Sequence, residues 1–218
     1  MTDTQSYTHL LWDWNGTLLD DLSLCLRVIN QMLEDRQLPA LTRDSYRAVF
    51  GFPVIDYYRK VGFDFAREPW ERVSTEFITA YEDGRPACPL MPEARLTLQA
   101  LHVNDYTQSI LSASKAEYLE RAVQDYGLEN FFLGWAGLED HHANSKVEVG
   151  KRHFQELSIN PRTTLMIGDT LHDAEVADAL GVDCWLISRG HQSRKRLERS
   201  GAAVLPSLRA ARDRLTGN

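Results

Sequence analysis

Short apolar runs recur along the chain, and each is followed by polar turn residues and then by a helical pattern. The runs are rich in β-branched and aromatic residues and occupy positions 9–12, 106–111, 164–167, 182–187 and 203–205. Runs of this kind suit strands that are buried on both faces of a sheet. We therefore predict buried strands at these positions.

Apolar residues at helical spacing lie between the runs. One face runs from Tyr118 to Tyr126 and stops at Gly127, a second combines Val147, Phe154 and Leu157, and a third ends before Gly181. Strands that alternate with helices need crossover connections, which favour a parallel sheet covered on both faces. The pattern predicts an α/β fold with a doubly wound parallel sheet.

Residues 20–89 differ from the rest of the chain because they contain no convincing strand. Two apolar helix faces run through 22–33 and 70–81, and Pro53 and Pro69 suit the first turns of two further helices. Pro86 and Pro89 mark a plausible return hinge. We predict an all-α cap at 20–89, inserted into a core of residues 1–19 and 90–218.

Three of the predicted strands end in polar residues that carry useful chemistry. Asp13, Ser112 and Asp169 follow the first, second and third runs, and Lys146 begins a later helix. Ligands of doubly wound sheets bind beyond the carboxyl ends of the strands, so these side chains can converge on one crevice. The alternative is that they only cap helices and turns, which also favour Asp and Ser.

Four local motifs resemble those of the haloacid dehalogenase superfamily, and they occur in the same order. Asp13-Trp14-Asn15-Gly16-Thr17 resembles the opening Asp-x-Asp-Gly-Thr motif, Ser112 and Lys146 match the second and third motifs, and 168–173 matches Gly-Asp-Thr/Ser-x-x-Asp. The helical insertion resembles the cap of the phosphoglycolate phosphatase-like branch. The resemblance covers nearly the whole chain and implies a Rossmann-like core.

The resemblance also implies a role for each motif. Asp13 would attack phosphorus and form an aspartyl-phosphate intermediate. Mg²⁺, which prefers oxygen ligands, would be held by Asp13, the main-chain carbonyl of Asn15, Asp169 and Asp173. Ser112 and Lys146 would contact the phosphoryl group, with Lys151 as the alternative lysine. Thr17 and Ala113 would complete the contacts to substrate.

Asn15 departs from this motif because the phosphatases of the superfamily carry an acid/base Asp there. An amide neither donates a proton to a leaving group nor accepts one from water at neutral pH. The loss of such help typically costs about 10²–10⁴-fold in rate. Three explanations stay open: water, His172 or His141 takes over the proton transfer; the substrate has a good leaving group; or the residue is engineered or degenerate.

The cap is expected to set specificity because it closes over the crevice and excludes water. Arg59 is a candidate to bind a second anionic group of the substrate, although an amphipathic helix with a solvated basic edge is the favoured explanation. Lys60 is the only lysine in the cap. It leaves open an alternative function, because enzymes of the phosphonoacetaldehyde hydrolase branch, which this chain resembles in lacking the second Asp, form a Schiff base on a cap lysine.

Composition narrows the range of partners. The 218 residues include 24 Lys and Arg and 31 Asp and Glu, a net charge of −7, which argues against a nucleic-acid binder. No apolar run approaches the roughly 20 residues of a membrane span, and residues 1–9 lack the basic start of a signal peptide. Three scattered cysteines fit reduced thiols. We expect a cytoplasmic monomer or homodimer without membrane partners.

Two further clusters are better explained as surface features. Residues 139–142 read Glu-Asp-His-His, but adjacent side chains seldom converge on one ion, so a polar loop is favoured over a metal site. The basic run 189–199 is interpreted as a solvated helix face.

These observations predict a Mg²⁺-dependent phosphatase that acts on a small phosphorylated metabolite, with phosphoglycolate as the default substrate. A catalytically impaired binding or regulatory protein on the same fold is the main alternative.

Overall fold

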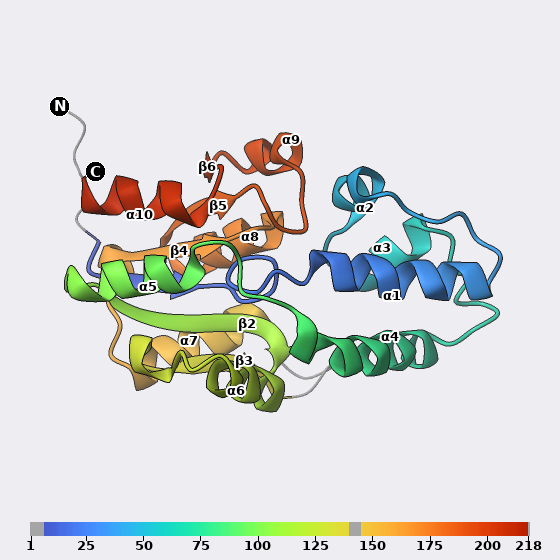
Figure 1. The fold of residues 1–218 in the computed structure, drawn as a ribbon, viewed down its shortest axis with the longest axis horizontal. Coiled ribbons are helices and arrows are strands. Elements are labelled where there is room, and N and C mark those ends of the chain that lie inside the picture. Colours follow the sequence, from blue (N-terminus) through green and yellow to red (C-terminus); the bar gives the residue numbers. More distant parts are fainter. Residues whose placement is uncertain (1–6, 140–144, 218) are drawn as a thin grey trace.

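The computed structural model describes residues 7–139 and 145–217. Within them, six parallel strands form one sheet in the order β3-β2-β1-β4-β5-β6 (Figure 1). The strands are β1 (His9–Trp12), β2 (Thr107–Lys115), β3 (Trp135–Leu138), β4 (Thr164–Gly168), β5 (Asp183–Ile187) and β6 (Ala203–Leu205). The predicted α/β class and the parallel sheet are confirmed, whereas β3 was not anticipated.

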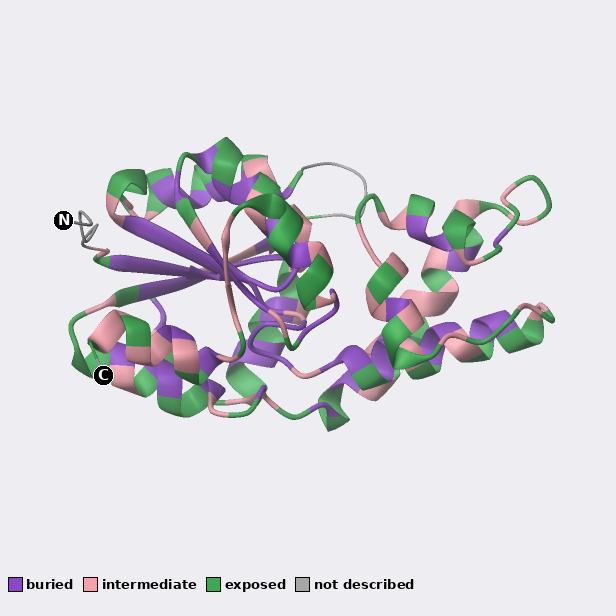
Figure 2. Cartoon of the chain, turned by 90° about the horizontal axis from the view of Figure 1, so that it is seen from above, coloured by how far each residue is buried: buried purple, intermediate pink, exposed green. Residues whose placement is uncertain are grey.

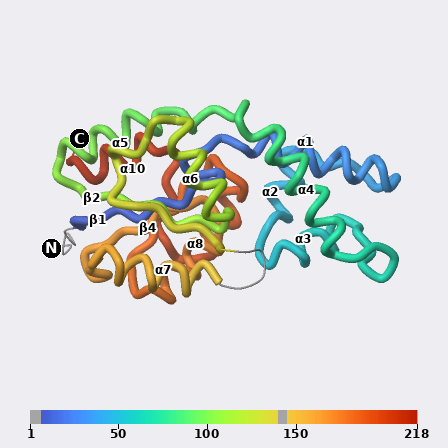
Figure 3. Tube along the Cα trace, turned by 90° about the horizontal axis from the view of Figure 1, so that it is seen from below, coloured from blue at the N-terminus to red at the C-terminus, as the bar shows by residue number. Residues whose placement is uncertain are grey.

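Helices cover both faces of this sheet. The helices α5 (Ala94–Val103), α6 (Ala116–Asp125) and α10 (Leu208–Thr216) pack on one face, and α7 (Lys146–Glu156) and α8 (Leu171–Leu180) pack on the other (Figure 3). The side chains of β1 alternate between the two faces. Leu10 and Trp12 belong to the hydrophobic cluster that includes α5, α6 and α10, and Leu11 belongs to the cluster that includes α7 and α8. All three side chains are fully buried, as expected for a strand covered on both sides. Figure 2 shows the buried strands between the two helical layers.

Four helices gather beyond one end of the sheet (Figure 1). They are α1 (Leu22–Asp35), α2 (Arg43–Val49), α3 (Val54–Lys60) and α4 (Trp70–Gly84), with α1 packed on α4. This is the predicted helical insertion, called the cap below. Pro53 and Pro69 stand immediately before α3 and α4 rather than inside their first turns. Arg36 ties the cap together because its guanidinium bonds to Glu68 and Glu76 at 2.8 and 2.6 Å.

The two segments that connect the cap to the core run side by side. The amide of Asp20 donates to the carbonyl of Pro89 at 2.9 Å, and the amide of Met91 donates to that of Leu18 at 2.8 Å. An antiparallel bridge between Leu19 and Leu90 lies between these bonds. The junction therefore falls where the hinge was predicted, while the division at 19/20 and 89/90 stays a prediction.

The basic run differs from the expected helix face. Its helix α9 spans only Arg194–Leu197, and His191 and Gln192 before it are buried. Residues 140–142 of the Glu-Asp-His-His cluster lie outside the described residues. In the described ranges, no helix is both long and apolar enough to cross a bilayer, and the cellular compartment stays a prediction.

Candidate active site

Three polar residues meet at the carboxyl edge of the sheet, beneath the cap. Asp13 follows β1, Ser112 lies within β2, and Asp169 follows β4. These three strands are neighbours in the sheet, so the predicted convergence occurs. The side chains are almost completely buried, and all three line one cavity.

Lys146 supplies positive charge to this edge. It is the first residue of α7, where the hydroxyl of Ser145 accepts from the amide of Glu148 and caps the helix. The ammonium of Lys146 lies 2.6 Å from Asp13 Oδ1 and 2.7 Å from Asp173 Oδ1. The alternative lysine, Lys151, is exposed and pairs with Glu148, so the structure brings Lys146 and not Lys151 to the site.

Asp173 is held by the first turn of α8. Its Oδ2 accepts from the hydroxyl and the amide of Thr170, at 2.7 and 3.0 Å, and from the amide of Asp169 at 3.2 Å. Its Oδ1 accepts from Lys146, so both carboxylate oxygens already have protein donors. Burial is the largest influence on Asp173 and raises its pKa, but the charge of Lys146 and the hydrogen bonds from Lys146 and Thr170 together hold the pKa below its usual range.

Asp13 and Asp169 carry less compensating charge. Burial, followed by the charge of Asp173, raises the pKa of Asp13 to about 6 despite Lys146. Burial also raises the pKa of Asp169 to about 8, although His191 opposes the shift. Such shifts show that the pocket disfavours bare negative charge and would be relieved by a cation.

The donor set fits a hard divalent cation. Oxygen atoms of Asp13, Asp169 and Asp173 all lie within 4.8 Å of one another. Mg²⁺ takes oxygen ligands, keeps several waters and needs few protein groups, so three neighbouring carboxylates suit it. The carbonyl of Asn15 as a further ligand stays a prediction.

Thr17 lies between two of these carboxylates. Its hydroxyl is 3.1 Å from Asp13 Oδ2 and 3.3 Å from Asp169 Oδ1, so it positions carboxylates rather than facing the cavity. Gly16 beside it has a φ of +75°, and a Cβ at this position would come within 2.4 Å of Asp169 Oδ2. The turn after β1 therefore needs glycine both for its conformation and for this close approach.

The Asn15 amide is fully engaged by protein groups. Its Nδ2 donates to Asp21 Oδ2 at 2.8 Å and to the hydroxyl of Tyr81 at 2.6 Å. Its Oδ1 accepts from the hydroxyl of Ser114 at 2.6 Å. An amide has two donor hydrogens, and both are used here, which leaves none for a substrate.

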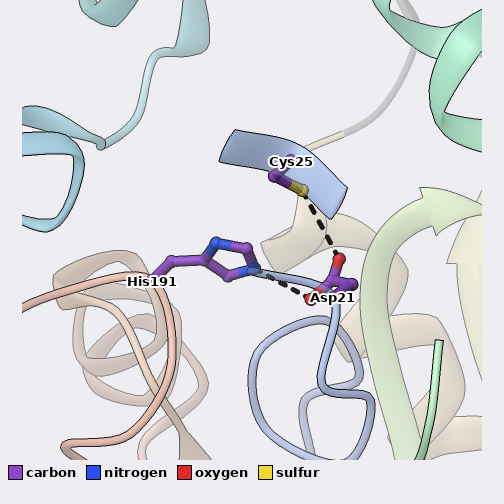
Figure 4. A group of neighbouring side chains, drawn as sticks. All are labelled: Asp21, Cys25 and His191. Atoms are coloured by element: carbon purple, nitrogen blue, oxygen red, sulfur yellow. Dashed lines mark hydrogen bonds and ion pairs between the residues drawn. The ribbon is translucent and has the colours of Figure 1, made fainter. Parts of the chain in front are cut away.

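Asp21 forms a second buried cluster that the sequence did not reveal. Its carboxylate accepts from the hydroxyl of Tyr81 at 2.8 Å and from the amide of Gly16 at 3.0 Å. It also accepts from the thiol of Cys25 at 3.7 Å and lies 3.1 Å from His191 Nε2 (Figure 4). Burial lowers the pKa of His191, but the Asp21 carboxylate outweighs burial and raises it to about 9. His191 is therefore an imidazolium that neutralises Asp21.

His191 also links the cap to the core. Its Nδ1 lies 3.0 Å from the hydroxyl of Tyr46 in α2, and its main-chain amide donates to Asp169 Oδ2. Sequence reasoning placed His191 on a solvated basic face. That interpretation is wrong for His191, and the neighbouring Gly190 also packs closely on the site, since a Cβ there would come within 2.1 Å of Asp169 Oδ2.

A cavity of about 260 Å³ joins the carboxylates to the cap. Ser112, Ala113 and Lys146 line it on the core side, as predicted for substrate contacts. His172 also lines it and stacks on Phe52, with ring centroids 4.6 Å apart.

Two other candidates are not brought to this cavity. Arg59 is half exposed and pairs with Asp56 at 2.7 Å, and Lys60 is exposed; neither is among the described residues that line the cavity. His141, proposed as a proton carrier, lies outside the described residues.

Known proteins are similar to this chain over most of its length. A phosphoglycolate phosphatase of Pseudomonas fluorescens is 25% identical over 211 residues, 92% of this chain and 77% of that protein. Pyrophosphatase PpaX of Oceanobacillus iheyensis is 24% identical over 176 residues, 77% of each chain.

Solved structures share the fold at lower identity. A haloacid dehalogenase-like hydrolase from Streptococcus pneumoniae superposes with a TM-score of 0.80 at 18% identity, covering 94% of this chain and 96% of its own. CbbY from Rhodobacter sphaeroides, solved in complex with phosphate, superposes with a TM-score of 0.69 at 16% identity. The match covers 93% of this chain and 95% of CbbY.

The profile of one family matches residues 10–187, which include all four motifs. This protein therefore belongs to the haloacid dehalogenase-like hydrolase family.

Proposed function

We propose that the protein hydrolyses a small phosphomonoester in the presence of Mg²⁺ through an aspartyl-phosphate formed on Asp13. The observation that carries the proposal is the placement of Asp13. Its Oδ1 is bound by Lys146, its Oδ2 by Thr17, and the second and third carboxylates lie within 4.8 Å. This arrangement fixes a nucleophilic carboxylate at the end of the cavity, next to a place for a cation.

The side chains around Asp13 have distinct tasks. Lys146 stabilises the negative charge that spreads over the phosphoryl oxygens during transfer. The hydroxyl oxygen of Ser112 accepts from the amide of Ser114 at 3.0 Å, and no acceptor among the described residues takes its hydrogen, which is left for a phosphoryl oxygen. Thr17 and Asp173 position their neighbours: Thr17 orients the carboxylate of Asp13, and Asp173 orients the ammonium group of Lys146.

When bound, Mg²⁺ supplies the positive charge that lets an anionic carboxylate approach a phosphate dianion. Asp13, Asp169 and Asp173 would hold it, Asp173 either directly or through water. The cap excludes bulk water from the cavity and so strengthens these interactions.

The names of the relatives suggest the first substrates to test. One relative is a phosphoglycolate phosphatase and another a pyrophosphatase, so phosphoglycolate and pyrophosphate head the panel. Lys60 lies away from the cavity, so no contact favours a Schiff-base enzyme of the phosphonoacetaldehyde hydrolase kind.

The test is phosphate release from a panel of phosphomonoesters, measured with Mg²⁺ and with EDTA. We expect release that needs the metal and disappears in Asp13→Ala. Asp125→Ala, which removes an exposed carboxylate at the end of α6, is the matched control and should behave like the wild type. If no compound is hydrolysed faster than by Asp13→Ala, the protein is a binding or regulatory member of the family instead.

A further inference from the structure

The cap side of the cavity is lined by apolar and aromatic side chains. They include Phe50, Phe52, Tyr57, Tyr58, Phe77 and Ile78, and we call this part the cap pocket. Its rings contact one another at right angles or nearly so, with the centroids of Phe50 and Tyr57 5.3 Å apart. Aromatic side chains in this arrangement offer both edges and faces to a further ring.

The cap pocket offers no charge partner for an anionic leaving group. Among the described residues that line the cavity from the cap, there is no lysine and no arginine. The basic side chains on the core side of the cavity already have acidic partners. Lys146 pairs with two carboxylates, Lys115 lies 2.8 Å from Glu117, His172 lies 3.3 Å from Glu175, and His191 lies 3.1 Å from Asp21. A carboxylate or second phosphate in the cap pocket would therefore lose its hydration without gaining a counter-charge.

The position of Asn15 adds a chemical constraint. Both amide hydrogens are given to Asp21 and Tyr81, so Asn15 neither protonates nor hydrogen-bonds a departing oxygen. An alkoxide leaves poorly without such help, whereas a phenolate, whose conjugate acid has a pKa of about 10 as in tyrosine, leaves as the anion.

We propose that the natural substrate is a phosphate monoester of a phenol, with its ring in the cap pocket and its phosphate against Asp13, Ser112 and Lys146. This inference rests on the proposed phosphatase function and names its substrate class. The cavity of about 260 Å³ lies just below the roughly 300–1,000 Å³ range of ligand pockets, which fits a single-ring compound.

The reaction then needs no acid from the protein. A carboxylate oxygen of Asp13 bonds to phosphorus, the bond from phosphorus to the ring oxygen breaks, and the electron pair leaves on phenolate, which takes a proton from water after release. A water molecule next attacks phosphorus, and the bond to Asp13 breaks with its electrons returning to the carboxylate. One proton of that water passes to solvent, so the products are a phenol and inorganic phosphate.

Three substrates separate recognition of the ring from the quality of the leaving group. Phenyl phosphate has the ring and a phenolate, benzyl phosphate has the ring and an alkoxide, and phosphoglycolate has an alkoxide and a carboxylate. We expect phenyl and benzyl phosphate to share a similar KM, with kcat about 10²–10⁴-fold lower for benzyl phosphate. Phosphoglycolate should have the highest KM and the lowest kcat of the three substrates. An equal or higher kcat/KM for phosphoglycolate would overturn the proposal.

A charge placed in the cap pocket tests the location of the ring. Ile78→Asp should raise the KM of phenyl and benzyl phosphate at least about tenfold because it buries a carboxylate beside the ring. Thr79→Asp adds the same charge to the exposed side of α4 and should change neither KM. Equal KM values for both variants, with folding verified by circular dichroism, would place the ring elsewhere.

Binding gives a readout that does not depend on turnover. Calorimetry with Mg²⁺ should show benzylphosphonate binding at least about tenfold more tightly than 3-phosphonopropionate, which carries a carboxylate at a similar distance. Should the wild type release no more phosphate than Asp13→Ala, the phosphatase function fails, and this comparison still decides the ligand class. Tighter binding of the carboxylate compound would overturn it.

Discussion

Replacing Asn15 by Asp should give the site the acid that it lacks. In the present structure the amide nitrogen lies 2.8 Å from Asp21 Oδ2. Two carboxylates at this separation repel each other by about 6 kcal/mol at an effective dielectric constant of about 20. One of them must therefore hold a proton at neutral pH, as in other carboxylate pairs.

The expected gain depends on the leaving group. A positioned acid typically contributes about 10²–10⁴-fold, but only where the departing oxygen needs its proton. Asn15→Asp should raise the rate of alcohol release in a single turnover by about 10²-fold or more for benzyl phosphate and by less than about threefold for 4-nitrophenyl phosphate. The variant should also be less stable, because the amide no longer donates to Asp21 and Tyr81.

Single-turnover kinetics with enzyme in excess over each substrate, in which release of the alcohol is followed, measure this difference. Asn104→Asp makes the same chemical change at an exposed position after α5 and serves as the control. An equal gain for the two substrates would show that the introduced carboxyl group acts other than as an acid. No gain for benzyl phosphate would show that the missing proton donor does not limit the reaction.

Three other predictions follow from the same geometry. Lys146→Met leaves two buried carboxylates without their partner, so phosphate release should fall to the level of Asp13→Ala. The free energy of unfolding, measured by urea titration in EDTA, should also drop by about 3–5 kcal/mol, and a wild-type value would contradict this. Burial, together with the charge of His153 in the case of His9, lowers the pKa of His9 and His153 to about 4. In the unfolded chain both histidines bind protons below about pH 6.5, so the free energy of unfolding should be full above that pH and fall by up to about 3 kcal/mol per histidine towards pH 4. His153→Phe should reduce the slope of unfolding free energy against pH, and an unchanged slope would refute the assignment. Finally, 4-nitrophenyl phosphate should release one equivalent of nitrophenol per enzyme in a rapid burst, because hydrolysis of the phosphorylated Asp13 lacks a general base; strictly linear release would count against that.

Much of the fold was predictable because buried parallel strands leave a plain apolar signature. The runs at 9–12 and 164–167 became β1 and β4, and the run at 106–111 became the first part of β2. The strand β3 escaped because Trp135–Leu138 is short, contains Gly137 and is mostly half-buried. Its neighbour β2 supplies the pairing partners that make it a strand, and such long-range pairing is invisible in a local pattern.

The residues of the site also divide into those that the sequence could place and those that it could not. Asp13 and Asp169 directly follow strands, Ser112 lies in the second half of β2, and Lys146 begins a helix, so local sequence and topology together fix their place. His191 could not be placed, because its burial depends on Tyr46 and Asp21, which are remote in sequence. Arg59 was a candidate on charge alone, and its side chain is satisfied by Asp56 one helical turn away.

The paired connections between cap and core also bear on how such a protein can be altered. Where the chain leaves the core at Leu19 it lies beside its return at Leu90, and two backbone hydrogen bonds hold the ends together. A segment of another length or fold could be spliced between these ends without disturbing the sheet, since the entropy of closing a loop rises only slowly with its length. The junction is thus a natural point for exchanging caps, and chimaeras built there would test specificity apart from chemistry.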